Sequence, residues 1–218
     1  MLLAKQIIAQ TRNYVESRLS GESSGHDWWH IDRVWRMAIR IAEAEKADRT
    51  VVELAALLHD IADWKLHNGD ETAGLHQAET FLGRTGIDAD TRAHVLDILS
   101  NLSFKGAGVA TPMKTLEGCV VQDADRLDAL GALGIARAFA YGGNKNRLIH
   151  HPNQQPVLHR NFEEYKSSRG PTINHFFEKL LLLKDRMNTA TAKQIAEDRH
   201  RFLEQYLNRF FKEWDGIL

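Results

Sequence analysis

Apolar residues recur along this chain at the spacing of α-helices. Near the N-terminus, two successive segments repeat apolar positions every three or four residues, which predicts two amphipathic helices. The apolar positions of the first segment are Leu2, Leu3, Ile7, Ile8, Val15 and Leu19. Those of the second segment are Ile31, Val34, Trp35, Ala38, Ile41 and Ala42.

The same pattern continues toward the C-terminus. A third helix is expected from Thr50, as N-cap, through Ala62. Further helices are expected over about 71–84, 89–103, 113–140, 172–187 and 190–214. All four prolines lie beyond residue 111 and mostly avoid the periodic segments, as expected because proline breaks helix interiors. Since no alternating strand pattern and no fixed-period repeat is evident, the sequence predicts an all-α fold.

One segment, over 141–170, departs from the helical pattern. It contains turn-forming residues, two prolines, and five Lys or Arg against two Glu. Loops of this length are typical of mobile surface loops or of lids over a substrate, and both interpretations stay open. We expect a single helical-bundle domain over 1–218, with its core at about 20–140 and two additional C-terminal helices over about 172–214.

Composition narrows the classes of function. The 218 residues include 28 Lys or Arg against 29 Asp or Glu, and this balance argues against a protein that coats nucleic acid. The single cysteine, Cys119, excludes an internal disulfide framework and a cysteine-based zinc site. The N-terminal segment MLLAKQIIAQ lacks the features of a signal peptide, and no apolar stretch is long enough to cross a bilayer. We therefore expect a cytoplasmic location.

Histidine and aspartate interrupt the apolar pattern at three places. They are His30 in GHDWWHIDRV, the pair His59-Asp60 at the end of VVELAALLHD, and Asp125 in QDADRLDALG. Imidazole nitrogens and carboxylate oxygens on three helices can hold one divalent cation. A buried hydrogen-bonded network is the structural alternative. The metal site is favoured because an unpaired aspartate after a buried helix would be costly.

The order H…HD…D in these motifs resembles that of the HD-domain superfamily of metal-dependent phosphohydrolases. The resemblance covers about residues 20–140, and the phrases LLHDIADWK and VQDADRLDALGALGIARAF are similar to a branch of nucleotide pyrophosphohydrolases. It implies an all-helical core and hydrolysis of a phosphoester or phosphoanhydride bond. Asp125 is preferred to Asp123 because it matches the family's A-D-[RK]-L pattern. The implied metal ligands are His30, His59, Asp60 and Asp125.

An acidic residue is expected to move the proton in the reaction. Asp63 comes four residues after His59, on the same face if the helix continues. It also matches the first acidic residue after the His-Asp pair in similar proteins that cleave pyrophosphate from guanosine nucleotides. Asp63 is therefore the expected catalytic residue, and an exposed residue at a helix C-terminus is the alternative.

Cationic residues are expected to bind the substrate phosphates. Arg33 lies one turn from His30, and a guanidinium binds phosphate through two parallel hydrogen bonds. Lys65 follows the His-Asp pair and Lys105 lies in the segment SFKG. For each lysine a solvated surface position is the alternative.

Other aromatic and histidine residues near these motifs are more ambiguous. Trp28, Trp29, Trp35 and Trp64 flank the motifs; one of them is a candidate to stack on a nucleobase, and most are expected in the core. Asp27 is expected either to cap the second helix or to orient a metal ligand without touching the ion itself. Two more histidines, His76 and His94, fall where dinuclear relatives place further ligands, but they lack the paired-histidine pattern. A single-metal site is therefore expected.

Together these features predict a hydrolase that releases pyrophosphate from nucleoside or deoxynucleoside triphosphates. The alternatives are a nucleotide monophosphatase, a phosphodiesterase, or a non-catalytic nucleotide-binding regulatory protein. The expected cofactor is one divalent ion, Mn²⁺ first, with Mg²⁺, Co²⁺, Fe²⁺ or Zn²⁺ as alternatives. The expected partner is a small phosphorylated molecule, with no membrane and no nucleic acid, and a homodimer stays open.

Overall fold

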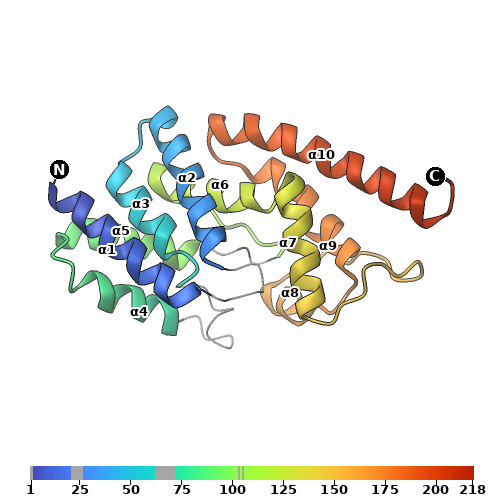
Figure 1. Ribbon diagram of the computed structural model, residues 1–218, viewed down its shortest axis with the longest axis horizontal. Helices are drawn as coiled ribbons and strands as arrows, with labels where there is room; N and C mark the ends of the chain where they lie inside the picture. The colour runs from blue at the N-terminus through green and yellow to red at the C-terminus, as the bar shows by residue number, and fades with distance from the viewer. Residues whose placement is uncertain (1, 21–26, 62–71, 103, 105) are drawn as a thin grey trace. The chain divides into compact units, whose positions relative to one another are not determined.

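The protein is described by a computed structural model in which the regular elements are helices (Figure 1). The residues that the structure describes are 2–20, 27–61, 72–102, 104 and 106–218. No strand occurs within these ranges, so the all-α prediction is confirmed. None of the helices in the described ranges combines the length and the apolar character needed to span a membrane.

The chain forms two compact units. Unit 1 comprises Met1–Lys105 and Ala110–Asp125, and unit 2 comprises Gly106–Val109 and Arg126–Leu218. The chain passes from unit 1 to unit 2 inside the helix α6 (Leu116–Asp128). A single domain over the whole chain stays a prediction.

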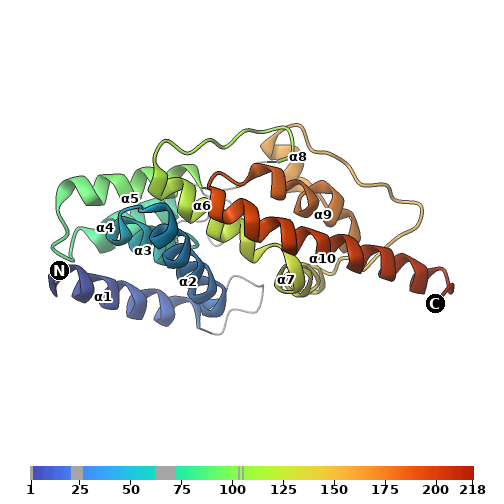
Figure 2. The same ribbon diagram turned by 90° about the horizontal axis from the view of Figure 1, so that it is seen from above.

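Unit 1 is built around α3, whose eight residues from Val51 to Leu58 are all buried. α3 contacts α1, α2 and α5, and α4 packs beside α5 (Figure 2). A helix buried on all sides is typical of a domain core. The bounds of these helices are α1 Leu2–Leu19, α2 Trp28–Glu45, α3 Arg49–Leu58, α4 Ala73–Leu82 and α5 Ala89–Asn101.

The N-cap of α3 is Asp48, and the prediction of Thr50 is wrong. The Asp48 carboxylate accepts hydrogen bonds from the backbone N–H groups of Thr50 and Val51, at 2.8 and 3.3 Å. We expect Asp48→Ala to lower the free energy of unfolding by about 1 kcal/mol, because two N–H groups lose their acceptor. Urea denaturation measures the free energy of unfolding, and Thr50→Ala is the matched control. Equal losses for the two variants would contradict the assignment.

The end of α3 also differs from the prediction. The helix stops at Leu58, with His59 as its C-cap, so it is shorter than predicted. His59 and Asp60 therefore lie in the turn that follows the helix, where side chains need not follow helical spacing. The shared face of His59 and Asp63 stays a prediction, because Asp63 lies outside the described residues.

A corner divides the helix predicted over 113–140. α6 ends at Asp128, and α7 runs from Gly131 to Asn144. Gly131 has φ +68°, which side chains rarely adopt, and a Cβ on Gly134 would lie 2.2 Å from a backbone carbonyl oxygen. These two glycines permit a sharp turn between consecutive helices.

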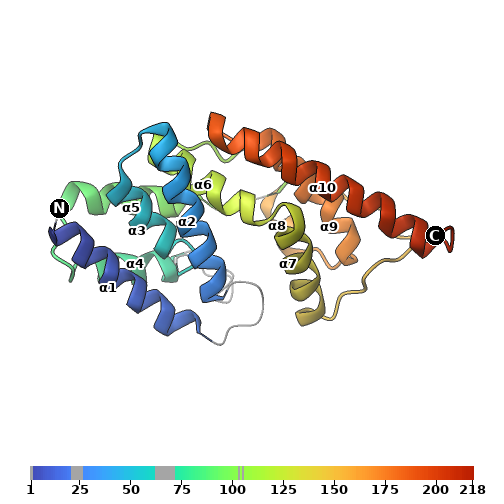
Figure 3. The same ribbon diagram turned by 45° about the horizontal axis from the view of Figure 1, so that its top comes forward.

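Unit 2 has α7, α10 and shorter helical segments between them, and α10 crosses and contacts α7 (Figure 3). α10 has the predicted bounds, whereas the continuous helix predicted over 172–187 is wrong. Lys179 leaves the helical region at φ −142°, and two 3-10 turns follow it. These turns still bury Leu180, Leu183 and Met187, which explains the apolar spacing. The segments are α8 Phe162–Ser167, α9 Thr172–Glu178, η2 Leu180–Leu182, η3 Lys184–Arg186 and α10 Ala190–Trp214.

The segment predicted as a loop or lid has helical parts and is anchored in unit 2. Its first residues belong to α7, and α8 forms near its end. The N–H groups of Thr172 and Ile173 donate to the carbonyl oxygens of Leu148 and Ile149, at 2.8 and 3.0 Å. These bonds hold Leu148 and Ile149 of the segment against the start of α9. A role as a lid over substrate stays a prediction.

Candidate metal centre

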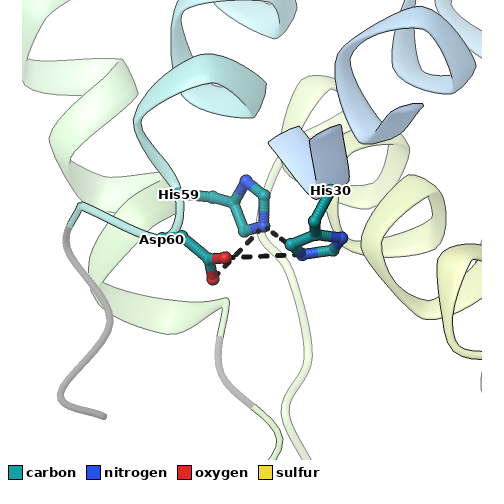
Figure 4. Close-up of side chains that lie close together, drawn as sticks. All are labelled: His30, His59 and Asp60. Atoms are coloured by element: carbon teal, nitrogen blue, oxygen red, sulfur yellow. Dashed lines mark hydrogen bonds and ion pairs between the residues drawn. The ribbon is translucent and has the colours of Figure 1, made fainter. Parts of the chain in front are cut away.

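Three side chains, one from α2 and two from the turn after α3, converge in unit 1. His30 lies in the first turn of α2, while His59 and Asp60 follow α3. All three are buried, and Figure 4 shows them pointing toward one another. The Asp27 carboxylate accepts a hydrogen bond from the His30 N–H at 2.9 Å, which confirms Asp27 as the cap of α2. This cap starts the helix at the point that directs His30 inward.

The distances in this cluster suit a single cation. His30 Nε2 and His59 Nε2 are 3.2 Å apart. The Asp60 carboxylate oxygens lie 3.5 Å from each of these nitrogens. Bonds of about 2.1 Å to one metal ion would place neighbouring ligand atoms roughly 3.0–3.4 Å apart. The cluster can therefore hold a divalent metal ion after small side-chain adjustments.

Asp125 adds a fourth group close to the two histidines of the cluster. Its Oδ1 lies 3.5 Å from His30 Nε2 and 3.8 Å from His59 Nε2. Its side chain is 37% exposed, whereas those of the other three residues are at most 3% exposed. Asp123, the competing carboxylate, is fully buried. Asp125 is therefore the most exposed of the four candidate ligands.

A backbone carbonyl orients the His59 ring. His59 Nδ1 lies 2.8 Å from the carbonyl oxygen of Ala56, which can only accept a hydrogen bond. Nδ1 therefore carries the proton, and Nε2 directs its lone pair toward His30. The sequence contains no signal for this contact, because every residue has a carbonyl oxygen.

A buried glutamate ties together the two helices that carry the cluster. Glu53 of α3 accepts hydrogen bonds from Trp35 Nε1 of α2 at 2.9 Å and from Arg49 Nε at 2.7 Å. The bond to Trp35 joins α2 to α3 and so helps to fix the separation of His30 and His59. The signal for it in the sequence is a lone glutamate inside the apolar segment VVELAALL.

The remaining predicted site residues are placed only in part. Arg33 lies on α2, half-buried, one turn after His30. The predicted catalytic and lysine residues, Asp63, Lys65 and Lys105, lie outside the described residues. Their roles stay predictions.

The two additional histidines are not part of this cluster. The His76 side chain is 80% exposed on α4 and lies 3.9 Å from Glu79. His94 Nε2 is 2.9 Å from Thr115 Oγ1 and 3.8 Å from Glu117. Among the described residues, the group of three able to hold a metal ion is His30, His59 and Asp60.

Comparison with known proteins links this geometry to a family. The model of the HD domain matches residues 28–130. The Bacillus subtilis protein YpgQ is 42% identical over 211 residues, which cover 95% of this chain and 94% of YpgQ. The crystal structure of a HD-superfamily hydrolase from Bacillus thuringiensis is 45% identical, with 97% of this chain and 98% of that chain covered and a TM-score of 0.75. YpgQ in its crystal structure with ADP is 40% identical in sequence to this chain. The match covers 97% of this chain and 100% of that chain, with a TM-score of 0.75.

Proposed function

The chain belongs to the HD-domain family of metal-dependent phosphohydrolases, and from this premise we propose that it hydrolyses nucleoside or deoxynucleoside triphosphates and releases pyrophosphate. The observation that carries the proposal is the convergence of buried His30, His59 and Asp60, with Asp125 facing both histidines. Nitrogen and carboxylate ligands suit Mn²⁺ among the divalent ions of metal-dependent hydrolases.

The nucleotide part of the proposal has separate support. The relative YpgQ was crystallised with ADP, and it covers nearly the whole of this chain. A nucleoside triphosphate has the same adenosine and diphosphate parts when its base is adenine. We therefore infer a nucleotide substrate for this chain as well.

Each proposed residue has a distinct part in the reaction. His30, His59, Asp60 and Asp125 hold the divalent ion, which when bound lowers the pKa of water and offsets phosphate charge. The Ala56 carbonyl keeps the His59 lone pair directed at the ion. Arg33 binds phosphate oxygens, with Lys65 and Lys105 as further cations. Asp63 accepts the proton of the attacking water or protonates the leaving oxygen.

The test uses metal-stripped protein reloaded with Mn²⁺, Mg²⁺ or Co²⁺. NTPs, dNTPs and monophosphates are supplied in turn, and phosphate and pyrophosphate are measured separately. We expect one pyrophosphate and one monophosphate per triphosphate, only with metal and fastest with Mn²⁺, at a metal-to-protein ratio near one.

Three outcomes would overturn the proposal. Phosphate release from monophosphates would identify a nucleotidase. Failure to hydrolyse any of these compounds at full metal loading would favour a nucleotide-binding regulator or a phosphodiesterase. A metal-to-protein ratio of two would replace the single-ion site with a dinuclear one.

A further inference from the structure

Trp29 is a large aromatic side chain that α2 leaves in solvent. It immediately precedes the buried His30 in the first turn of α2 and is 62% exposed. Among the described residues, no hydrogen bond, ion pair or ring contact engages its indole. Its neighbour Trp28 is buried, with the Arg12 guanidinium 5.6 Å from its ring centroid. Packing of unit 1 therefore explains why a tryptophan stands at position 28, but it does not explain the exposed tryptophan at position 29.

Arg33 lies between His30 and Trp29 around the axis of α2. Successive residues of an α-helix are rotated by about 100°, so Arg33 lies roughly 60° around α2 from His30, and Trp29 lies roughly 40° beyond Arg33. Exposure increases in the same order, from buried His30 through half-buried Arg33 to exposed Trp29. We call these three residues the strip, because their positions around α2 and their exposure order them from the buried metal ligand to solvent.

The surroundings of Trp29 favour an anionic ligand over an apolar protein partner. The same helix face continues with Arg36 and Arg40, which are both exposed. Arg36 Nη2 pairs with Asp32 at 2.9 Å, and its side chain still projects from the surface. A docking site for an apolar partner would need further apolar side chains along this face. An aromatic ring at the end of a row of arginines is suited to a ligand with a planar apolar part and several negative charges.

We propose that Trp29 stacks on the nucleobase of the substrate while Arg33 binds its phosphates. The inference rests on the proposed function, because it takes the ligand of the metal cluster to be a nucleotide. Along the strip, His30 then binds the metal ion, Arg33 binds the phosphates and Trp29 stacks on the base. Every nucleobase has a face that can stack on an indole, so this contact accepts different bases.

The test compares a ligand that has a base with one that has none. Binding of ADP and of inorganic pyrophosphate to the Mn²⁺-loaded protein is measured by calorimetry for wild type, Trp29→Ala and Trp29→Phe. Leu3→Ala, which removes another exposed apolar side chain in unit 1, is the control. We expect Trp29→Ala to weaken ADP binding about tenfold and to leave pyrophosphate binding within about twofold. Trp29→Phe is expected to regain most of the affinity for ADP.

The outcomes separate this inference from the proposed function. Unchanged ADP affinity in Trp29→Ala, or equal losses for both ligands, would overturn the stacking role even if wild type hydrolyses triphosphates. A loss confined to ADP would support stacking even if wild type hydrolyses none of them, and only the proposed function would then fail. Wild type that binds neither ligand would overturn the stacking role, whereas the proposed function is decided by the hydrolysis measurement alone.

Discussion

Replacing Asp60 with alanine is expected to remove the bound metal ion and to lower triphosphate turnover by about 10³-fold or more. Asp60 is buried, and its two oxygens face His30 Nε2 and His59 Nε2 at 3.5 Å each. Without this carboxylate, the two neutral imidazoles and the half-exposed Asp125 hold a divalent ion weakly. Loss of the several kcal/mol that a metal ion contributes to the transition state corresponds to a decrease of this size.

The matched control for Asp60→Ala is Asp32→Ala. Asp32 is also a buried carboxylate of unit 1, but it pairs with Arg36 and lies outside the cluster. Metal content after dialysis and the initial rate of pyrophosphate release are measured for both variants. Full activity of Asp60→Ala with unchanged metal content would refute the assignment of the site.

Thermal unfolding gives a second measurement that does not depend on turnover. Metal that binds only the folded protein raises its midpoint temperature, so wild type should be stabilised by Mn²⁺. Asp60→Ala should show little of this shift.

Phe176→Ala is expected to cause the largest loss of stability among single substitutions in unit 2, about 3–5 kcal/mol in the free energy of unfolding. Phe176 of α9 is fully buried, and its ring centroid lies 5.9 Å from those of Phe139 and Tyr206. Alanine would leave a cavity between α7, α9 and α10. Urea denaturation measures the loss of stability. Phe202→Ala is the control, because Phe202 is half-exposed. A loss below about 1 kcal/mol for Phe176→Ala would contradict the packing described for unit 2.

The same denaturation curves test the organisation of the chain. One transition, seen identically by circular dichroism and by tryptophan fluorescence, would support the prediction of a single domain. Two transitions, of which Phe176→Ala shifts only one, would show that the two units unfold separately.

Most helices could be predicted from the sequence because burial of one face imposes a spacing on apolar residues. α10 begins and ends where its pattern predicts, at Ala190 and Trp214. The errors lie where a local backbone feature overrides the pattern. Gly131 turns the chain between α6 and α7, and Lys179 ends α9, although apolar residues recur across both positions.

The site could be predicted as a set of residue types but not as an arrangement. His30, His59, Asp60 and Asp125 stand out because ionisable side chains next to apolar helices require partners. The Ala56 carbonyl that orients His59 and the Glu53 bond that joins α2 to α3 depend on how the helices pack. Neither contact has a spacing rule along the chain.

The sequence by itself determined the all-α class, most of the helices and the residues of the candidate metal centre, because residue type and spacing carry that information. Only the tertiary structure decided which side chains are buried, and the consecutive residues Trp28 and Trp29 show why. They are chemically identical, yet Trp28 is 4% exposed and Trp29 is 62% exposed. Neighbours on a helix point about 100° apart, so packing on one side of α2 covers the first ring and leaves the second in solvent.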